Sequence, residues 1–180
     1  MTVQAILIGP PGSGKSTVGR LLAKRLRARF MDSDREIERR EKLTVPEIFK
    51  QKGEEHFRFL ERQFIVELAK REAEPASGGI VLSVGGGLPV YYENMTLLLS
   101  LGPVVFLSAS PAQLTRRINS NQDRPLLSSA QSEGRAQLSG RLEKLLCERQ
   151  AVYARAHHTV ETDKLSVSEV VDAIYDFLAL

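Results

Sequence analysis

The stretch GPPGSGKS, residues 9–16, decides the fold of this chain. An apolar run typical of a buried strand precedes it over 3–8, and the amphipathic pattern of a helix follows over 17–29. Strand, glycine-rich loop and helix are the setting that this phosphate-binding motif requires. Its glycines let backbone N–H groups turn toward a polyphosphate, and the helix start adds its positive dipole end. A purely structural glycine turn is the alternative.

Two side chains of the loop have separate predicted tasks. Lys15 is expected to reach the β- and γ-phosphates of ATP, and the Ser16 hydroxyl to hold Mg²⁺. The predicted nucleotide contacts are Gly12, Ser13, Gly14, Lys15, Ser16 and Thr17.

Apolar runs and helical patterns alternate along the rest of the chain, and its 180 residues fit one domain over 1–180. Short apolar strands separated by helices predict an α/β fold, with a parallel sheet covered on both faces. The expected strands lie near 3–9, 29–32, 79–84, 103–108 and 158–161. The expected helices lie near 15–28, 34–42, 45–51, 54–73, 91–101, 111–119, 134–156 and 167–179.

Helix starts and loops can also be placed. Thr44 to Glu47 and Ser166 to Glu169 have the spacing of capping boxes, and Ser110 precedes a proline at a first helical position. Residues 74–79 read as a surface loop, and 119–133, rich in Asn, Ser and Gln, as a longer loop or lid.

Ligands of parallel α/β folds gather at the carboxyl ends of strands. The second strand runs into Asp32-Ser33-Asp34, where one carboxylate could face Mg²⁺ and the other a substrate hydroxyl. A helix N-cap followed by a first-turn acid would use the same residues. The third strand ends in Gly85-Gly86-Gly87 and lacks the acidic residue with which many NTPases hold Mg²⁺. We therefore expect Asp32 to substitute for it, in a small transferase.

Three arginines are candidates for anion binding, although each taken singly is typical of surface charge. Arg124 lies beside Pro125 in the predicted lid, where a mobile cation could neutralise a phosphoryl transition state. Arg58 and Arg149 could form a fork for a substrate carboxylate.

The composition argues against several other classes of protein. Net charge is +3, from 25 basic and 22 acidic residues, which is too mild to indicate nucleic acid, and Trp is absent. No apolar stretch is long enough to span a bilayer. The single cysteine, Cys147, is interpreted as a partly buried structural thiol, and His56 and His157-His158 as structural. We expect a cytoplasmic monomer that binds neither nucleic acid nor membrane.

Taken together, these residues resemble the shikimate kinases, small P-loop kinases of the aromatic amino-acid pathway. The likeness runs from about Val3 to the final helix. It rests on GPPGSGKSTVGR at 9–20, DSD at 32–34, IF at 48–49, GExxFRxxE at 53–61, GGG at 85–87, RPLL at 124–127 and RxxxY at 149–153.

The resemblance implies ATP-dependent phosphorylation of the shikimate 3-hydroxyl, which yields ADP and shikimate 3-phosphate. It also implies a three-layer α/β/α P-loop fold with a five-stranded parallel sheet in the order 2-3-1-4-5. A substrate-binding segment would occupy about 33–61 and a lid about 118–131.

Residue roles follow from the same resemblance. Asp34 would contact the substrate hydroxyls and receive the proton. Arg58, braced by Glu61, and Arg149 would hold the carboxylate. The remaining roles assign Gly85, Gly86 and Gly87 to the substrate site, Lys15 and Arg124 to the transferring phosphate, Arg117 to the adenine, and Val45, Phe49, Phe57, Pro125 and Leu126 to the apolar side of the pocket.

Three positions depart from the family pattern. Many members have Gly near position 42, where this chain has Lys42. A left-handed cap at a non-Gly residue costs about 1 kcal/mol, so we expect this helix to end in another way. Leu165 and Val167 stand where many members place Arg and Pro against the adenine.

Three alternatives remain. A gluconate-type kinase shares the loop and the size, but the Arg58, triple-glycine and Arg149 combination argues against it. A nucleoside-monophosphate kinase shares the architecture but not the 53–61 signature. A non-catalytic member of the family would be expected to have lost Lys15, Asp34 or an arginine of the site, and all are present.

Overall fold

Strand β1 (Thr2–Ile8) stands at the centre of a five-stranded parallel sheet in the computed structural model, which describes residues 2–72, 79–120 and 135–179. The strand order is β2-β3-β1-β4-β5, and every neighbouring pair is parallel. This confirms the predicted fold class and strand order. The other strands are β2 (Arg29–Asp32), β3 (Gly79–Ser83), β4 (Val104–Ser108) and β5 (His158–Glu161).

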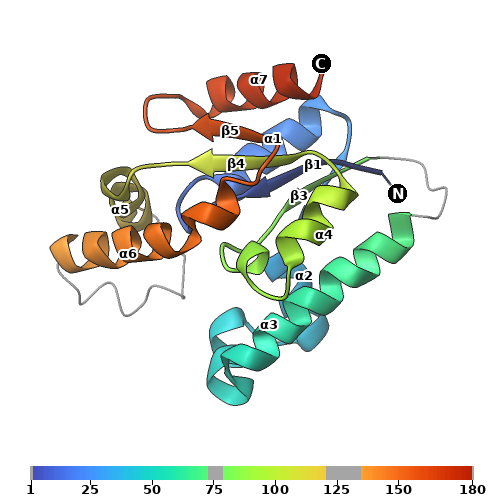
Figure 1. Ribbon diagram of the computed structural model, residues 1–180. Helices are drawn as coiled ribbons and strands as arrows, with labels where there is room; N and C mark the ends of the chain where they lie inside the picture. Colours follow the sequence, from blue (N-terminus) through green and yellow to red (C-terminus); the bar gives the residue numbers. More distant parts are fainter. Residues whose placement is uncertain (1, 73–78, 121–134, 180) are drawn as a thin grey trace.

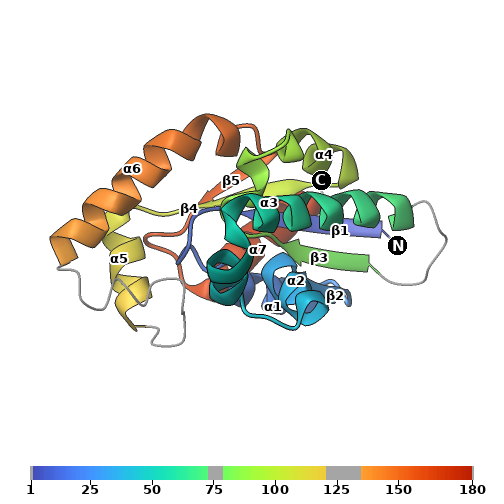
Figure 2. The same cartoon turned by 90° about the horizontal axis from the view of Figure 1, so that it is seen from below.

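Helices cover both faces of the sheet, as the apolar strands predicted (Figure 1). On one face α1 (Lys15–Arg25) and α7 (Val167–Leu178) bury Leu22 and Ile174 against the inner strands. On the other, α3 (Val45–Glu72) and α4 (Asn94–Leu101) bury Ile65 and Leu98. Figure 2 shows α3 and α4 on the near side of the sheet in that view.

The remaining helices lie around the carboxyl ends of the strands. Helix α2 (Ser33–Glu41) follows β2 directly and packs on α3, and the short 3₁₀ turn η1 (Leu88–Val90) lies beside α4. Helices α5 (Pro111–Ser120) and α6 (Arg135–Tyr153) pack together on the side toward which β4 and β5 point (Figure 1). This end of the sheet is where a ligand is expected.

The predicted helix starts are confirmed. Ser166 and Glu169 form a complete capping box, and Ser110 Oγ accepts from Gln113 N at 3.3 Å. Glu47 likewise accepts from Thr44 N at 2.7 Å, while Glu47 N donates to Thr44 Oγ1 at 3.4 Å.

Gly53 interrupts α3. Its φ of 83° and ψ of 168° are non-helical and place a kink between the two helical segments that the sequence predicted at 45–51 and 54–73.

The expectation for position 42 was wrong. Lys42 ends α2 in the left-handed conformation itself, at φ 56° and ψ 29°. The turn places Ile37 of α2 in one apolar cluster with Val45 and Ile48 of α3. Burial of these side chains offsets the backbone strain at Lys42.

The helix predicted over 91–101 was wrong at its start. Tyr92 and Glu93 have φ values of 53° and 55°, and α4 begins only at Asn94. The Asn94 side chain is buried, and its Nδ2 donates to Leu88 O at 2.9 Å. This bond stabilises the turn that separates η1 from α4.

Cys147 is exposed on α6, not partly buried as predicted. Most of the predicted lid, including Arg124, Pro125 and Leu126, lies outside the described residues, as does most of the 74–79 loop. Within the described part of the chain, no helix combines the length and the apolar character needed to cross a membrane.

Candidate functional site

The glycine-rich loop connects β1 to α1 with three glycines at positive φ. These angles are 145° at Gly9, 83° at Gly12 and 98° at Gly14, and Gly14 forms the N-cap of α1. Gly12 is also enclosed by α5, because a Cβ added there would lie 2.9 Å from Ile118 Cγ1. The sequence therefore needs glycine here both for the backbone path and for space.

Lys15 is held against the loop from which it projects. Its ammonium donates to Gly9 O at 2.8 Å and to Pro10 O at 3.0 Å, and the side chain is buried. The positive charge thus lies directly over the backbone of the loop, at the start of a helix. Such a position favours an anion.

Asp32 caps α2, one of the two alternatives that the sequence left open, and it also contacts the phosphate loop. Its Oδ1 caps α2 by accepting from Asp34 N and Arg35 N at 3.2 and 3.4 Å. Its Oδ2 accepts from Ser16 Oγ at 2.9 Å. The two carboxylate oxygens therefore join the start of α2 to the phosphate loop.

The Ser16 and Asp32 pair fits a Mg²⁺ ion. Both side chains offer hard oxygen ligands, and Mg²⁺ commonly takes one or two protein oxygens together with substrate phosphates. No cluster of three or more His, Cys, Asp or Glu side chains suited to a metal occurs among the residues that the structure describes. A metal held mainly by the nucleotide is consistent with this donor set.

Ser33 joins the ends of β2 and β3. Its buried hydroxyl accepts from Gly85 N at 2.9 Å and donates to Asp34 Oδ1 at 3.3 Å. Burial, and next the charge of Asp32, raise the pKa of Asp34 to about 6, although Lys15 and the Ser33 hydroxyl oppose the rise. Asp34 is therefore a carboxylate with the proton affinity that general-base catalysis near neutral pH requires.

Arg58 lies between two carboxylates of α3. Its Nη1 donates to Glu61 Oε2 at 2.8 Å, and its Nε and Nη2 donate to Glu54 Oε1 at 3.1 and 2.8 Å. Burial raises the pKa of Glu61 to about 7, against the opposing charge of Arg58. Glu61 Oε1 is buried, and it has no hydrogen-bond partner within the described ranges of the chain.

The triple-glycine turn brings the separate parts together. A Cβ on Gly87 would lie 2.5 Å from Arg58 Nη1. A Cβ on Gly86 would lie 3.1 Å from Gly9 O and 3.5 Å from Arg149 Nη1. Both predicted arginines therefore lie against the turn, and the turn lies against the phosphate loop.

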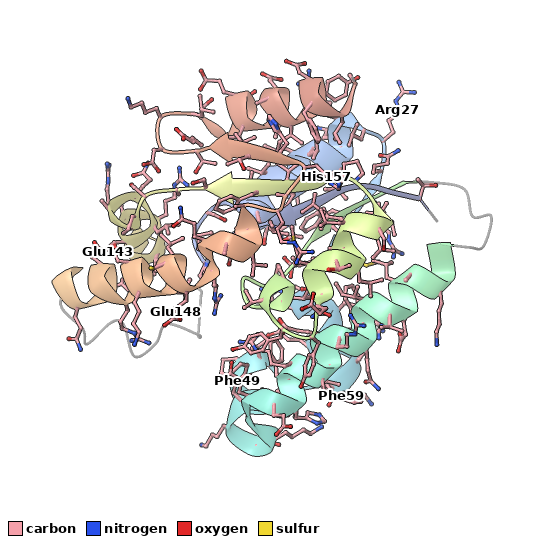
Figure 3. The ribbon with its side chains drawn as sticks, viewed as in Figure 1. Arg27, Phe49, Phe59, Glu143, Glu148 and His157 are labelled. Atoms are coloured by element: carbon pink, nitrogen blue, oxygen red, sulfur yellow. The ribbon has the colours of Figure 1, made fainter. Side chains whose placement is uncertain are left out.

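Arg149 and Arg58 come from different helices. Figure 3 labels Glu148, next to Arg149, on α6 and Phe49 on α3, and the two helices approach the site from different sides. The hydroxyl of Tyr153, one helical turn beyond Arg149, donates to Gly86 O at 2.6 Å. This bond fixes the end of α6 to the glycine turn.

The predicted apolar side is formed in part by described residues. Val45 and Phe57 are buried, and the Phe49 and Phe57 ring centroids lie 5.0 Å apart. The Arg58 guanidinium carbon lies 5.8 and 5.5 Å from these two rings. The aromatic pair therefore borders the predicted carboxylate site.

Arg117 of α5 reaches Thr162, the residue that follows β5. Its Nη1 and Nη2 donate to Thr162 Oγ1 and Thr162 O at 2.8 and 2.7 Å. Leu165 and Val167 are exposed, with 36% and 40% of their surface accessible. The adenine site at Arg117 stays a prediction.

Ser33, Glu54 and Tyr153 stand in the quoted motifs, but no role in this site was predicted for them, and Tyr91 was not singled out. Three of the four carried a usable signal. Ser33 stands between the two aspartates. Glu54 is four residues from Arg58 and Tyr153 is four residues from Arg149, so each lies on the same helix face as its arginine. Tyr91 lacked one, because it reaches Glu54 only through the unexpected turn before α4.

Comparisons with known proteins agree with this geometry. The family model described as "Shikimate kinase" matches residues 11–179. A shikimate kinase of Sulfurihydrogenibium sp. is 39% identical over 168 residues, which cover 93% of each chain. The crystal structure of a shikimate kinase from Bacteroides thetaiotaomicron superposes with a TM-score of 0.87 at 32% identity, over 99% of both chains. A shikimate kinase from Acinetobacter baumannii, solved in complex with shikimate, gives 0.83 at 35% identity, over 97% of this chain and 92% of that one.

Proposed function

Since this chain belongs to the shikimate kinase family, we propose that it transfers the γ-phosphoryl group of ATP to the 3-hydroxyl of shikimate. The products are ADP and shikimate 3-phosphate, a step in the biosynthesis of aromatic amino acids. The observation that carries the proposal is the glycine turn at 85–87. It lies against the phosphate loop on one side and against two arginines and two carboxylates on the other.

We assign the nucleotide to the loop between β1 and α1. Backbone N–H groups of Gly12, Ser13, Gly14, Lys15, Ser16 and Thr17 would surround the phosphates. The Lys15 ammonium, now on Gly9 O and Pro10 O, would turn to the β- and γ-phosphates. Arg117 would flank the adenine.

Ser16 and Asp32 would hold Mg²⁺, which neutralises phosphate charge when bound. The 2.9 Å contact between Ser16 Oγ and Asp32 Oδ2 supports this pairing. Because Asp32 also caps α2, the metal site and the start of the substrate-binding segment at 33–61 would be mechanically joined.

We assign the substrate to the glycine turn. Arg58 and Arg149 would bind its carboxylate, and the small glycines would leave space for the ring. Asp34, three residues before Ile37 on α2, would contact the hydroxyl groups. Glu61 would keep Arg58 in place through the 2.8 Å ion pair.

The reaction needs positioning and charge neutralisation more than covalent chemistry. The substrate oxygen attacks the γ-phosphorus, its proton passes to the Asp34 carboxylate, and the bond to the ADP oxygen breaks. Lys15 would neutralise charge on the transferred group. Arg124, in the proposed lid at 118–131, would neutralise charge on the same group.

We further propose that the protein acts as a monomer in the cytoplasm, with no nucleic acid or membrane partner. The mild net charge of +3 supports the absence of a nucleic-acid partner. Size-exclusion chromatography with light scattering tests the oligomeric state.

The function is tested by ADP release from ATP and Mg²⁺ with shikimate, gluconate or nucleoside monophosphates as acceptor. We expect turnover with shikimate alone, and its loss in Arg58→Ala and Asp34→Asn. Arg39→Ala is the matched control, because Arg39 is 70% exposed on α2. Turnover with another acceptor would overturn the substrate assignment while leaving the phosphate loop intact.

A further inference from the structure

We propose that Glu54 is an internal competitor for the substrate carboxylate at Arg58, and that it sets how selectively the site binds that group. The inference rests on the proposed function, because it concerns the same arginine. Glu54 would act through Arg58 without touching the reacting atoms, which makes it a positioning residue.

The two carboxylates engage different edges of one guanidinium. Glu61 Oε2 accepts from Nη1, whereas Glu54 Oε1 accepts from both Nε and Nη2. The Nε and Nη2 edge is one that a carboxylate can bind with two parallel hydrogen bonds. Glu54 therefore occupies a position that would suit the carboxylate of the substrate.

Burial separates a permanent partner from an exchangeable one. The side chain of Glu61 is 1% exposed and that of Arg58 is 11% exposed, whereas Glu54 is 54% exposed. Releasing Glu61 would leave a buried charge unpaired. Releasing Glu54 returns its carboxylate to water, at the small free-energy cost typical of an exposed ion pair.

Tyr91 completes the arrangement. Its hydroxyl donates to Glu54 Oε1 at 3.3 Å, and its ring centroid lies 4.5 Å from the Arg58 guanidinium carbon. The unexpected turn at Tyr92 and Glu93 follows this tyrosine directly. Tyr91 therefore stabilises the pairing of Glu54 with Arg58.

Glu54 is ionised near neutral pH. Hydrogen bonds from Arg58, together with the Arg58 charge, the Tyr91 hydroxyl and the charge of Arg149, keep the pKa of Glu54 below the usual range, although burial opposes them. An ionised Glu54 thus faces both arginines that would receive the substrate. A neutral side chain of equal size would remove the competition and keep the shape.

The test is calorimetric titration of shikimate into wild type, Glu54→Gln and Glu55→Gln, without ATP. Glu55→Gln is the matched control, since it removes the same charge from the next, also exposed, position. We expect the Kd for shikimate to fall about two- to fivefold in Glu54→Gln, in keeping with an exposed ion pair, and to stay unchanged in Glu55→Gln. Tyr91→Phe should lower the Kd by a smaller factor.

A second ligand separates competition from a general change of shape. The neutral carboxamide analogue of shikimate should bind wild type and Glu54→Gln equally, so that the preference for carboxylate over carboxamide rises in the variant. An equal or higher shikimate Kd in Glu54→Gln would overturn the inference while leaving the proposed function standing. Failure of wild type to bind shikimate would overturn the proposed function, and this inference with it.

Discussion

The carboxyl groups of Asp34 and Glu61, from two different helices, meet at Gly85. A Cβ on that glycine would lie 2.5 Å from Asp34 Oδ1 and 3.0 Å from Glu61 Oε1. Burial is the largest cause that raises the pKa of both carboxyl groups. The charge of Asp34 further raises the pKa of Glu61, and the charge of Asp32 further raises the pKa of Asp34. Two buried carboxylates therefore share a small volume beside the proposed substrate.

The first prediction concerns the pH dependence of activity. If Asp34 accepts the substrate proton, it must be ionised, so kcat/KM should fall about tenfold per unit as pH drops below the Asp34 pKa of about 6. Above pH 7 this limb should be flat. Steady-state rates with shikimate from pH 5 to 8 measure it, and a profile that stays level down to pH 5 would contradict the role of Asp34.

Asp34 should also cost stability. The pKa of Asp34 is raised in the folded state. The contribution of Asp34 to the free energy of unfolding is therefore fully present below its pKa in the unfolded state, and it is lost as pH rises through about 6. Asp34→Asn removes this charge and should stabilise the protein at pH 8 by about 1–2 kcal/mol, or several degrees in Tm. Thermal melts at pH 8 and pH 4 measure the difference. A gain of the same size at pH 4 would show that the charge is not its cause.

Ser33 should tune the same carboxylate. Its hydroxyl donates to Asp34 Oδ1 and lowers the pKa of Asp34, so Ser33→Ala should move the acid limb of the kcat/KM profile to higher pH. Ser100→Ala is the control, because Ser100 is exposed and donates only to Leu97 O of its own helix. An unmoved limb in Ser33→Ala, with kcat merely reduced, would indicate a structural role instead.

Much of this architecture could be predicted because its signals are periodic or local. The apolar runs fixed five strands to within two residues at each end, and the loop over 9–16 placed the site. The resemblance to the shikimate kinases implied that Glu61 braces Arg58, and the two residues form an ion pair on one helix face. In each case the signal that carried the prediction lay within a short, continuous segment of the sequence.

What could not be predicted depends on contacts between distant segments. Nothing at Tyr92 or Glu93 marks a turn, since neither is the glycine or proline that usually does. The turn exists because the buried Asn94 binds Leu88 O and Arg62. The contact of Tyr91 with Glu54 follows from that turn, so the sequence pattern could not predict it either.

Lys42 offers a test of strain outside the site. A left-handed backbone at a non-Gly residue costs about 1 kcal/mol or more, so Lys42→Gly should stabilise the protein by about 1 kcal/mol. Urea denaturation at neutral pH measures the change. Kinetics with shikimate should stay the same, because Lys42 lies at the opposite end of α2 from Asp34. A loss of stability would mean that packing between α2 and α3 needs the lysine side chain.

The final prediction concerns Gly87, where space decides function. A Cβ there would lie 2.5 Å from Arg58 Nη1 and 2.8 Å from its guanidinium carbon, closer than such atoms can approach. Arg58 is fixed by the buried Glu61, so it can move only by weakening that ion pair. Gly87→Ala should therefore displace the guanidinium and raise the Kd for shikimate about tenfold or more, which corresponds to about 1.4 kcal/mol.

The affinity for ATP should stay within about twofold, because the nucleotide is proposed to bind the other loop. Gly140→Ala is the matched control: a Cβ there meets nothing within 4 Å among the residues that the structure describes, and alanine favours a helix interior. An unchanged shikimate Kd in Gly87→Ala would remove Arg58 from the substrate site.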